Sequence, residues 1–350
     1  MVPKSSKLLP PLLSEEQKHV VKLYLHTLDR LNFPASKGAL KSAIMSVGKL
    51  NQPPSKEYVR KLQKELGIPL RRARNGIPAR EKKTDIEFVT DFSEKLLDLY
   101  QKRKYFPEDI FNADEVNLQA NGRSFEFFST RATVRKNLVG EGHLTVLVCA
   151  NAAGSLLKPF FIFPGEDMSC LPAGGLENCY LAFNNSAYMD EELFKQWLSR
   201  MIAETIKSRT TDDGKLCPAL LLLDGHSSHL NSTTLMTAAC HNIDVLCLPS
   251  HTMHLLQPND CALNKTLKDN MQANLSSLLE LHEKITLAEL AHLFSKAMKY
   301  ENIPRSVIQS FRHTGVFPHD PLQMSKVLVK EKVKELTDPN EEIIEMSQIW

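Results

Sequence analysis

The sequence predicts an α/β protein in which a mixed sheet is flanked by helices and preceded by a small all-α domain. Beyond residue 108, apolar runs typical of buried strands alternate with amphipathic segments, a pattern that places helices on the faces of a sheet. The first 67 residues instead show three short helical patterns. Charge divides the chain in the same way, since residues 1–84 hold 18 lysines and arginines against 6 acids, while the remainder is acidic overall.

Composition narrows the class of protein. A chain of 350 residues is long enough for two domains, and its hydrophobic content of 42% is ordinary for a globular protein. No apolar run approaches the roughly 20 residues that cross a bilayer, and the N-terminus lacks the pattern of a signal peptide, so no membrane partner is expected. Seven cysteines without a CxxC pair argue against a disulfide framework or a thiolate zinc site.

The basic N-terminal region, residues 1–72, is called the head below. Its first helix is predicted over 13–33, where Ser14 and Gln17 have the spacing of a capping box. A second, shorter helix follows over 36–47. A third is predicted over 53–67, where Pro53 and Pro54 block an earlier start, Ser55 can cap the helix and Gly67 ends it.

Cations of the third helix fall largely off its apolar stripe, which favours a helix-turn-helix arrangement that binds double-stranded DNA. A generic three-helix bundle with a solvated basic face is the alternative. The basic linker that follows could track the DNA backbone, or act as a nuclear import signal and make the protein nuclear. The candidate DNA-binding residues are Lys56, Arg60, Lys61, Lys64, Arg71, Arg72 and Arg74.

The body is predicted to hold its strands and helices in a fixed order. Buried strands are expected where apolar runs are bounded by turn residues, and helices where apolar residues recur at helical spacing. The predicted segments are a short strand within 108–118 that ends at Asp114, a hairpin over 142–165, a helix over 190–207, a strand over 218–224, a helix over 232–242, a strand over 243–249 and a long helix over 257–282.

Three carboxylates lie at the ends or starts of these predicted elements. Asp114 ends the first predicted strand, Asp224 ends "PALLLLD", and Asp260 opens the long helix. Sites in such sheets form at strand ends, so the three acids are expected at one edge. Carboxylates gathered there would repel one another unless they shared hard divalent cations, which predicts Mg²⁺ (or Mn²⁺), as two ions of the kind used in phosphodiester chemistry.

Other interpretations of the same residues stay open. Each carboxylate taken singly has an ordinary explanation, as a turn residue, a first-turn helix acid or a loop acid. Two HxxH pairs could bind zinc, although neither looks helical, or could line the cleft around the cations. A serine hydrolase is weaker, because no GxSxG motif is present. The residues of the two pairs are His226 with His229 and His251 with His254, and the candidate serines are Ser227 and Ser228.

Several motifs, in this order, resemble those of a known family. The segments "NADE", "LLLDGHSSHL", "LCLPSHTMHLLQPND" and "FRHTGVFPHDP" are similar to the catalytic domain of the pogo/Tigger/jerky-type transposases, a branch of the mariner-like DDE (DDD) superfamily. "LTVLVCANAAGSLLKPFFIFPG" also resembles that family, and the head resembles the helix-turn-helix of the centromere protein B type. The family usually has an apolar residue, commonly Leu, where this chain has Asn259.

The resemblance implies an RNase H-like core with an Asp–Asp–Asp metal site made of Asp114, Asp224 and Asp260. The spacing of 35 residues between Asp224 and Asp260 is consistent with this family. It also implies a metal-dependent DNA endonuclease or strand-transfer activity, on a chain divided into a head (1–72), a linker (73–86), a catalytic domain (87–321) and a charged tail (322–350). A non-catalytic, host-adopted DNA-binding or chromatin protein is the alternative, and a homo-oligomer is left open.

Overall fold

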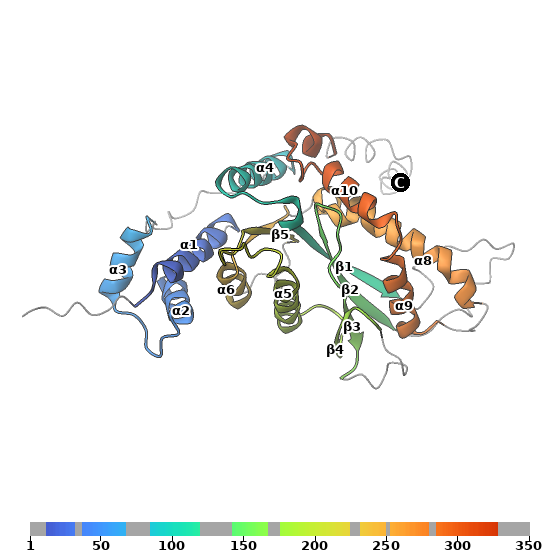
Figure 1. Cartoon of the computed structure of the whole chain (residues 1–350), viewed down its shortest axis with the longest axis horizontal. Helices are drawn as coiled ribbons and strands as arrows, with labels where there is room; N and C mark the ends of the chain where they lie inside the picture. Colours follow the sequence, from blue (N-terminus) through green and yellow to red (C-terminus); the bar gives the residue numbers. More distant parts are fainter. Residues whose placement is uncertain are drawn as a thin grey trace, which may run out of the picture.

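The computed structural model describes residues 12–31, 37–67, 85–119, 142–166, 176–224, 232–249, 253–279 and 285–327. A six-stranded sheet lies at the centre of the molecule, with helices on both of its faces (Figure 1). The sheet has the strand order β4-β3-β2-β1-β5-β6. Its strands are β1 (Ile110–Gln119), β2 (His143–Asn151), β3 (Phe160–Pro164), β4 (Tyr180–Asn184), β5 (Ala219–Leu223) and β6 (Ile243–Cys247).

Strand directions show that the sheet is mixed, as predicted. The neighbours β1, β2 and β3 are antiparallel, whereas β5 lies parallel to β1 on the other side and β6 continues parallel to β5. An antiparallel meander whose first strand is flanked by parallel crossover strands is the RNase H-like arrangement. The RNase H-like α/β prediction is therefore confirmed by the topology.

The two parallel strands occupy the places that their composition predicts. All five residues of β5 are apolar and buried, because helices cover both faces of this part of the sheet. Leu220 and Leu222 join the hydrophobic cluster on one face, while Leu221 and Leu223 join the cluster on the other. The strand is thus held between two packed layers, and the residue that follows it is Asp224.

The first strand is longer than predicted. It does not end at Asp114 but continues to Gln119, so that prediction is wrong. The reason is that β2 pairs with β1 along its whole length, whereas β5 pairs only with Ile110, Phe111 and Asn112. Asp114 therefore lies inside a strand, just beyond the point where the parallel pairing stops.

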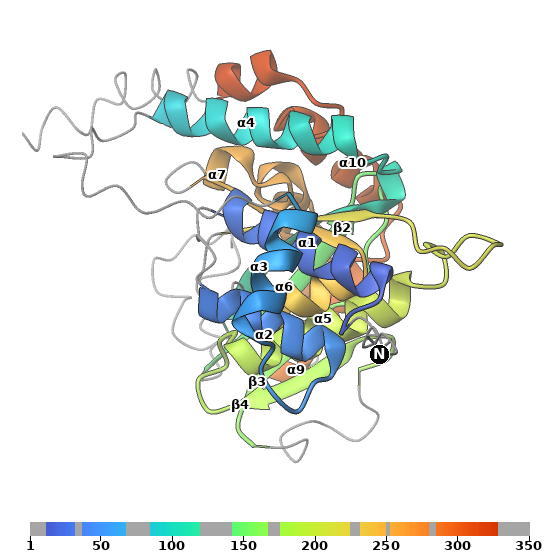
Figure 2. The same ribbon diagram turned by 90° about the vertical axis from the view of Figure 1, so that its left-hand side faces the viewer.

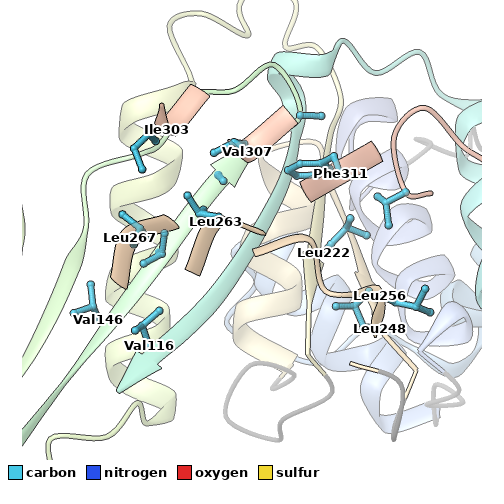
Figure 3. Packing of buried hydrophobic residues seen from close by; sticks show 14 of the residues in the cluster. Val116, Val146, Leu222, Leu248, Leu256, Leu263, Leu267, Ile303, Val307 and Phe311 are labelled. Atoms are coloured by element: carbon cyan, nitrogen blue, oxygen red, sulfur yellow. The ribbon is translucent and has the colours of Figure 1, made fainter. Parts of the chain in front are cut away.

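One face of the sheet is covered mainly by the C-terminal helices (Figure 3). Side chains from the strands, such as Val116, Val146 and Leu222, meet Leu263 and Val307 there. The long helix predicted over 257–282 is interrupted at its start by a π-turn. The elements of this face are α4 (Asp85–Lys102), α7 (Met253–Leu256), the π-turn η5 (Asn259–Leu263), α8 (Asn264–Leu279), α9 (Leu287–Ala297) and α10 (Ile303–His313).

The opposite face carries α5 (Glu191–Thr205), α6 (Ser232–Cys240) and the head. The head helices are α1 (Glu15–Arg30), α2 (Lys37–Gly48) and α3 (Lys56–Glu65). The predicted capping box is present, since the Ser14 side chain accepts from the backbone of Gln17 and the Gln17 side chain accepts from that of Ser14. In Figure 2 the head faces the viewer, with α6 behind α1, and these two helices are in contact.

Candidate functional site

The first candidate ligand, Asp114, faces the C-terminal helices. Side chains alternate along a strand, and Ile110, Val116 and Leu118 of β1 belong to the hydrophobic cluster on that face. Asp114 has the same parity and points to the same side. Its Oδ1 accepts a hydrogen bond of 2.9 Å from the backbone N–H of Glu115.

The second candidate ligand, Asp224, follows β5 on the neighbouring strand. The register pairs Ile110 with Leu220 and Asn112 with Leu222. The pairing stops there, so Asp114 and Asp224 each lie two residues past the last pair. Asp224 also lies close enough to Cys247 of β6 to add to the effect of burial, and the two together raise the pKa of that thiol to about 12.

The third candidate ligand, Asp260, is joined to Asp114 by an asparagine that sequence reasoning missed. The Nδ2 of Asn264 donates to Oδ2 of Asp114 and to Oδ1 of Asp260, both at 2.9 Å. Asp260 lies in η5 and Asn264 starts α8, four residues later. The structure therefore brings two of the three predicted carboxylates to a single amide group. The signal in the sequence was the spacing of four, which places two residues on one helix face.

The electrostatics of this pair are unfavourable without a cation. Burial raises the pKa of Asp114 well above its ordinary range, and the negative charge of Asp260 raises it further. The hydrogen bond from Asn264 acts in the opposite direction and favours the ionised carboxylate. A half-buried carboxylate, Asp114, thus shares one donor with the exposed carboxylate of Asp260, and paired acids of this kind are typical of a site that binds positive charge.

A second asparagine pair anchors the π-turn to the sheet. Asn259 is fully buried, and its backbone N–H donates to Oδ1 of Asn112 at 3.0 Å. Its Nδ2 donates to the backbone oxygens of Asn112 at 3.3 Å and Val148 at 3.1 Å. The side chain of Asn112 donates in turn to the backbone oxygen of Leu222 at 3.2 Å. The residue before Asp260 is thus bonded to β1 and β2 directly and to β5 through Asn112, which fixes the position of Asp260.

The structure does not describe the side chains of the four histidines predicted to line the site. His226, His229 and His251 lie outside the described residues, as does the side chain of His254. Within the described ranges, no three histidine, cysteine or acidic side chains are gathered closely enough to hold a metal ion. The structure thus brings Asp114 and Asp260 together, whereas Asp224 follows the adjoining strand and does not form a group of three with them.

The donors that are present fit a hard divalent cation. They are carboxylate oxygens, and the side-chain Oδ1 of Asn264 is buried without a hydrogen-bond partner among the described residues. Mg²⁺ and Mn²⁺ prefer oxygen ligands of this kind, whereas zinc prefers nitrogen and sulfur. A buried acceptor without a partner is unfavourable, and it belongs to the amide that bridges the acids, so a half-turn of that amide would offer its oxygen to a cation there.

Only some of the predicted DNA-binding cations lie within the described residues. Those of α3 are all exposed, and α3 is the head helix farthest from the sheet in Figure 1. Residues 68–84, which follow the head helices, lie outside the described residues. The exposed cations are Lys56, Arg60, Lys61 and Lys64, and those outside the described ranges are Arg71, Arg72 and Arg74.

Sequence comparison relates most of the body to one superfamily. Residues 141–310 match the family model of the DDE superfamily endonucleases. The match includes Asp224 and Asp260 and begins after Asp114.

Curated relatives agree with that match. The chain is 29% identical to the Jerky protein of Mus musculus over 168 residues (45% of this chain and 28% of the relative), and 26% identical to the Jerky protein homolog of Homo sapiens over 212 residues (58% and 36%). It is also 28% identical over 248 residues to a protein of Cochliobolus lunatus named MFS-type transporter clz9 (67% and 26%). The chain thus spans only about a quarter to a third of these relatives. Among the described residues, no helix is long and apolar enough to cross a membrane.

Solved structures of the Mos1 mariner transposase are similar in outline. Its catalytic domain aligns with a TM-score of 0.44 and 14% identity, over 73% of this chain and 97% of that one. Its paired end complex with Mg aligns with a TM-score of 0.45 and 13% identity, over 94% and 82%. The family match over residues 141–310, the Jerky relatives and the mixed sheet together identify a DDE superfamily endonuclease domain in the body of this chain.

Proposed function

We propose that this chain is a nuclear DNA-binding protein whose sheet carries a divalent-metal-dependent site for cleavage and transfer of DNA strands. One observation carries the proposal: Asp114 and Asp260 are held by one amide group, and Asp114 and Asp224 each lie two residues past the last pair of the adjoining strands β1 and β5. A DDE-type site needs all three acids, and two of them already share a hydrogen-bond donor. Mg²⁺ or Mn²⁺, as two ions, is the proposed cofactor.

The acids and the asparagines of the site would have different roles. Asp114, Asp224 and Asp260 would hold the cations through their carboxylate oxygens. When bound, such a pair of ions activates the attacking oxygen and stabilises the leaving one in phosphodiester displacement. Asn259 and Asn112 anchor the turn that carries Asp260, and pairing with β2 holds Asp114 within its strand. A rigid support of this kind is what a site needs in order to hold the scissile phosphate in line.

The head would supply affinity for the duplex. The exposed cations Lys56, Arg60, Lys61 and Lys64 lie on one short helix and can contact backbone phosphates. Such contacts position a protein on DNA without reading its sequence. The basic residues that follow α3, including Arg71, Arg72 and Arg74, would extend the contact and direct the protein to the nucleus.

The test compares DNA cleavage with DNA binding in the full-length chain. Asp224→Asn removes one carboxylate charge and keeps the shape of the side chain. We expect this variant to bind duplex DNA like the parent chain and to lose nicking and strand joining in Mg²⁺ or Mn²⁺. Parent protein that neither nicks nor joins any candidate end sequence would refute the catalytic half of the proposal.

A second candidate function is that of a host-adopted DNA-binding protein without catalysis. It is favoured by the described acids, which are not gathered as a group of three. The same assay separates the two functions. Under this alternative, the parent chain and Asp224→Asn bind DNA equally, and neither cleaves it with either cation.

A further inference from the structure

Asn264 stands at a break in the helical backbone. Its N–H donates to the backbone oxygen of Asn259, five residues earlier, which makes the preceding turn a π-turn. Single π-turns within α-helical segments occur often at functional sites, because they add a residue and redirect the side chains that follow. Here the redirected residue is Asn264, whose side chain reaches both Asp260 and Asp114 of β1.

The two ends of the Asn264 amide are used unequally. The Nδ2 makes one hydrogen bond to each carboxylate, so both of its donors are satisfied. The Oδ1 is buried and has no hydrogen-bond partner among the described residues. A buried acceptor without a partner is costly, and here it lies on the side chain that touches both acids.

We propose that Asn264 is a third protein ligand, through Oδ1, of the cation that Asp114 and Asp260 would share. Before the cation arrives, the NH₂ group takes its place between the two carboxylates. Rotation of the terminal amide by half a turn exchanges donor for acceptor, and the torsion involved has a broad two-fold preference. Amide oxygens are ordinary ligands of hard cations.

The inference rests on the proposed function, because it requires a cation at the carboxylates. It adds a residue that the family match does not assign and explains how two acids tolerate each other without metal. A competing explanation is that Asn264 only bridges the acids. In that case its NH₂ competes with the cation, and removing it would tighten metal binding.

The experiment measures Mn²⁺ binding to the full-length chain without DNA, by paramagnetic resonance of free Mn²⁺ and by titration calorimetry. Asn264→Ala removes both ends of the amide, and we expect the affinity for Mn²⁺ to fall by at least about tenfold. Asn264→Asp offers only oxygen and should bind Mn²⁺ at least as tightly as the parent. Asn274→Ala makes the same change farther along α8, where the amide contacts Tyr300, and should leave Mn²⁺ binding unchanged.

A further variant guards against misfolding of Asn264→Ala. Asn264→Lys keeps a donor between the carboxylates but has no acceptor, so it should fold and fail to bind Mn²⁺. Equal or tighter binding by Asn264→Ala or Asn264→Lys would overturn the inference and leave the proposed function standing. Parent chain that binds no more Mn²⁺ than Asp260→Asn would overturn both.

Discussion

At the scale of residues, the site depends on short polar side chains that connect the acids to the sheet. Asn112, Asn259 and Asn264 form two linked sets of hydrogen bonds beneath and between the carboxylates. The residue at position 259, commonly Leu in the family that the sequence resembles, is here a buried amide bonded to two strands. The position of Asp260 is therefore set by hydrogen bonds as well as by packing.

The raised pKa of Asp114 predicts how the stability of the metal-free protein depends on pH. The unfolded chain ionises this carboxyl near its ordinary value of 3.8, and the folded chain only at higher pH. At a pH between the unfolded and the folded pKa, the unfolded state binds fewer protons than the folded state. The stability that Asp114 contributes is therefore fully present below pH 3.8 and is lost as the pH rises through the raised pKa of the folded state. Asp114→Asn cannot ionise. With a chelator present, it should be more stable than the parent chain at neutral pH.

The measurement is urea unfolding of both proteins from acidic to neutral pH. The difference in unfolding free energy should vanish in acid, where Asp114 is protonated in both states, and grow as pH rises. Asp98→Asn, an exposed change on α4, serves as the control and should show no such growth. A parent chain that is as stable as Asp114→Asn at neutral pH would contradict the assigned shift.

At the scale of elements, the head is joined to the body by a buried charge cluster. Asp244 of β6 has a side chain only 1% exposed. Its carboxylate lies 2.9 Å from Nη2 of Arg30 in α1 and 2.9 Å from Nε of Arg103, which follows α4. The hydroxyl of Tyr105 donates to the same carboxylate at 2.8 Å. One acid thus ties together the last turn of α1, the end of α4 and the edge strand of the sheet.

Removing this charge should weaken the docking of the head. Asp244→Asn leaves two largely buried guanidinium groups without their counter-charge, so we expect a loss of about 3 kcal/mol in unfolding free energy. Asp98→Asn breaks an exposed pair with Lys102 and should cost at most about 1 kcal/mol. Urea unfolding measures both, and faster proteolysis of the head in Asp244→Asn would report its release. Equal stability of the two variants would show that the cluster does not hold the head.

At the scale of the whole molecule, the head and the carboxylates lie on different sides of the sheet. Head residues share a hydrophobic cluster with α5, α6 and one sheet face, while Asp114 and Asp260 lie on the face under α8 and α10. The exposed helix α3 is on the outer side of the head (Figure 1). Duplex held by α3 would therefore have to be a different stretch of DNA from the one at the carboxylates.

The cations of α3 predict a steep salt dependence of DNA binding. If all four contact phosphates, replacing them with glutamine should lower the slope of log affinity against log salt by about 3 to 4, since each contact contributes roughly 0.9. Exposed Lys207 and Lys215, in the segment after α5, supply a control pair whose replacement should leave the slope unchanged. Fluorescence anisotropy over a salt series measures both, and an unchanged slope in the α3 variant would rule out that helix as the DNA contact. The four residues are Lys56, Arg60, Lys61 and Lys64.

The sequence by itself determined the local elements and the order of the acids. Apolar runs such as that of β5, helix caps such as Ser14 and Ser55, and breakers such as Gly67 act within a few residues, so they can be read along the chain. The mixed sheet followed from the alternation of these elements. Asp224 and Asp260 could be singled out because each directly follows or begins an element.

Only the tertiary structure decided how these parts meet. The extension of β1 past Asp114 depends on pairing with β2, and the role of Asn264 depends on an acid 150 residues away. Docking of the head depends on Arg30 meeting Asp244, 214 residues along the chain. Such contacts are set by which buried polar groups find partners when distant strands and helices pack, and no local pattern contains that information.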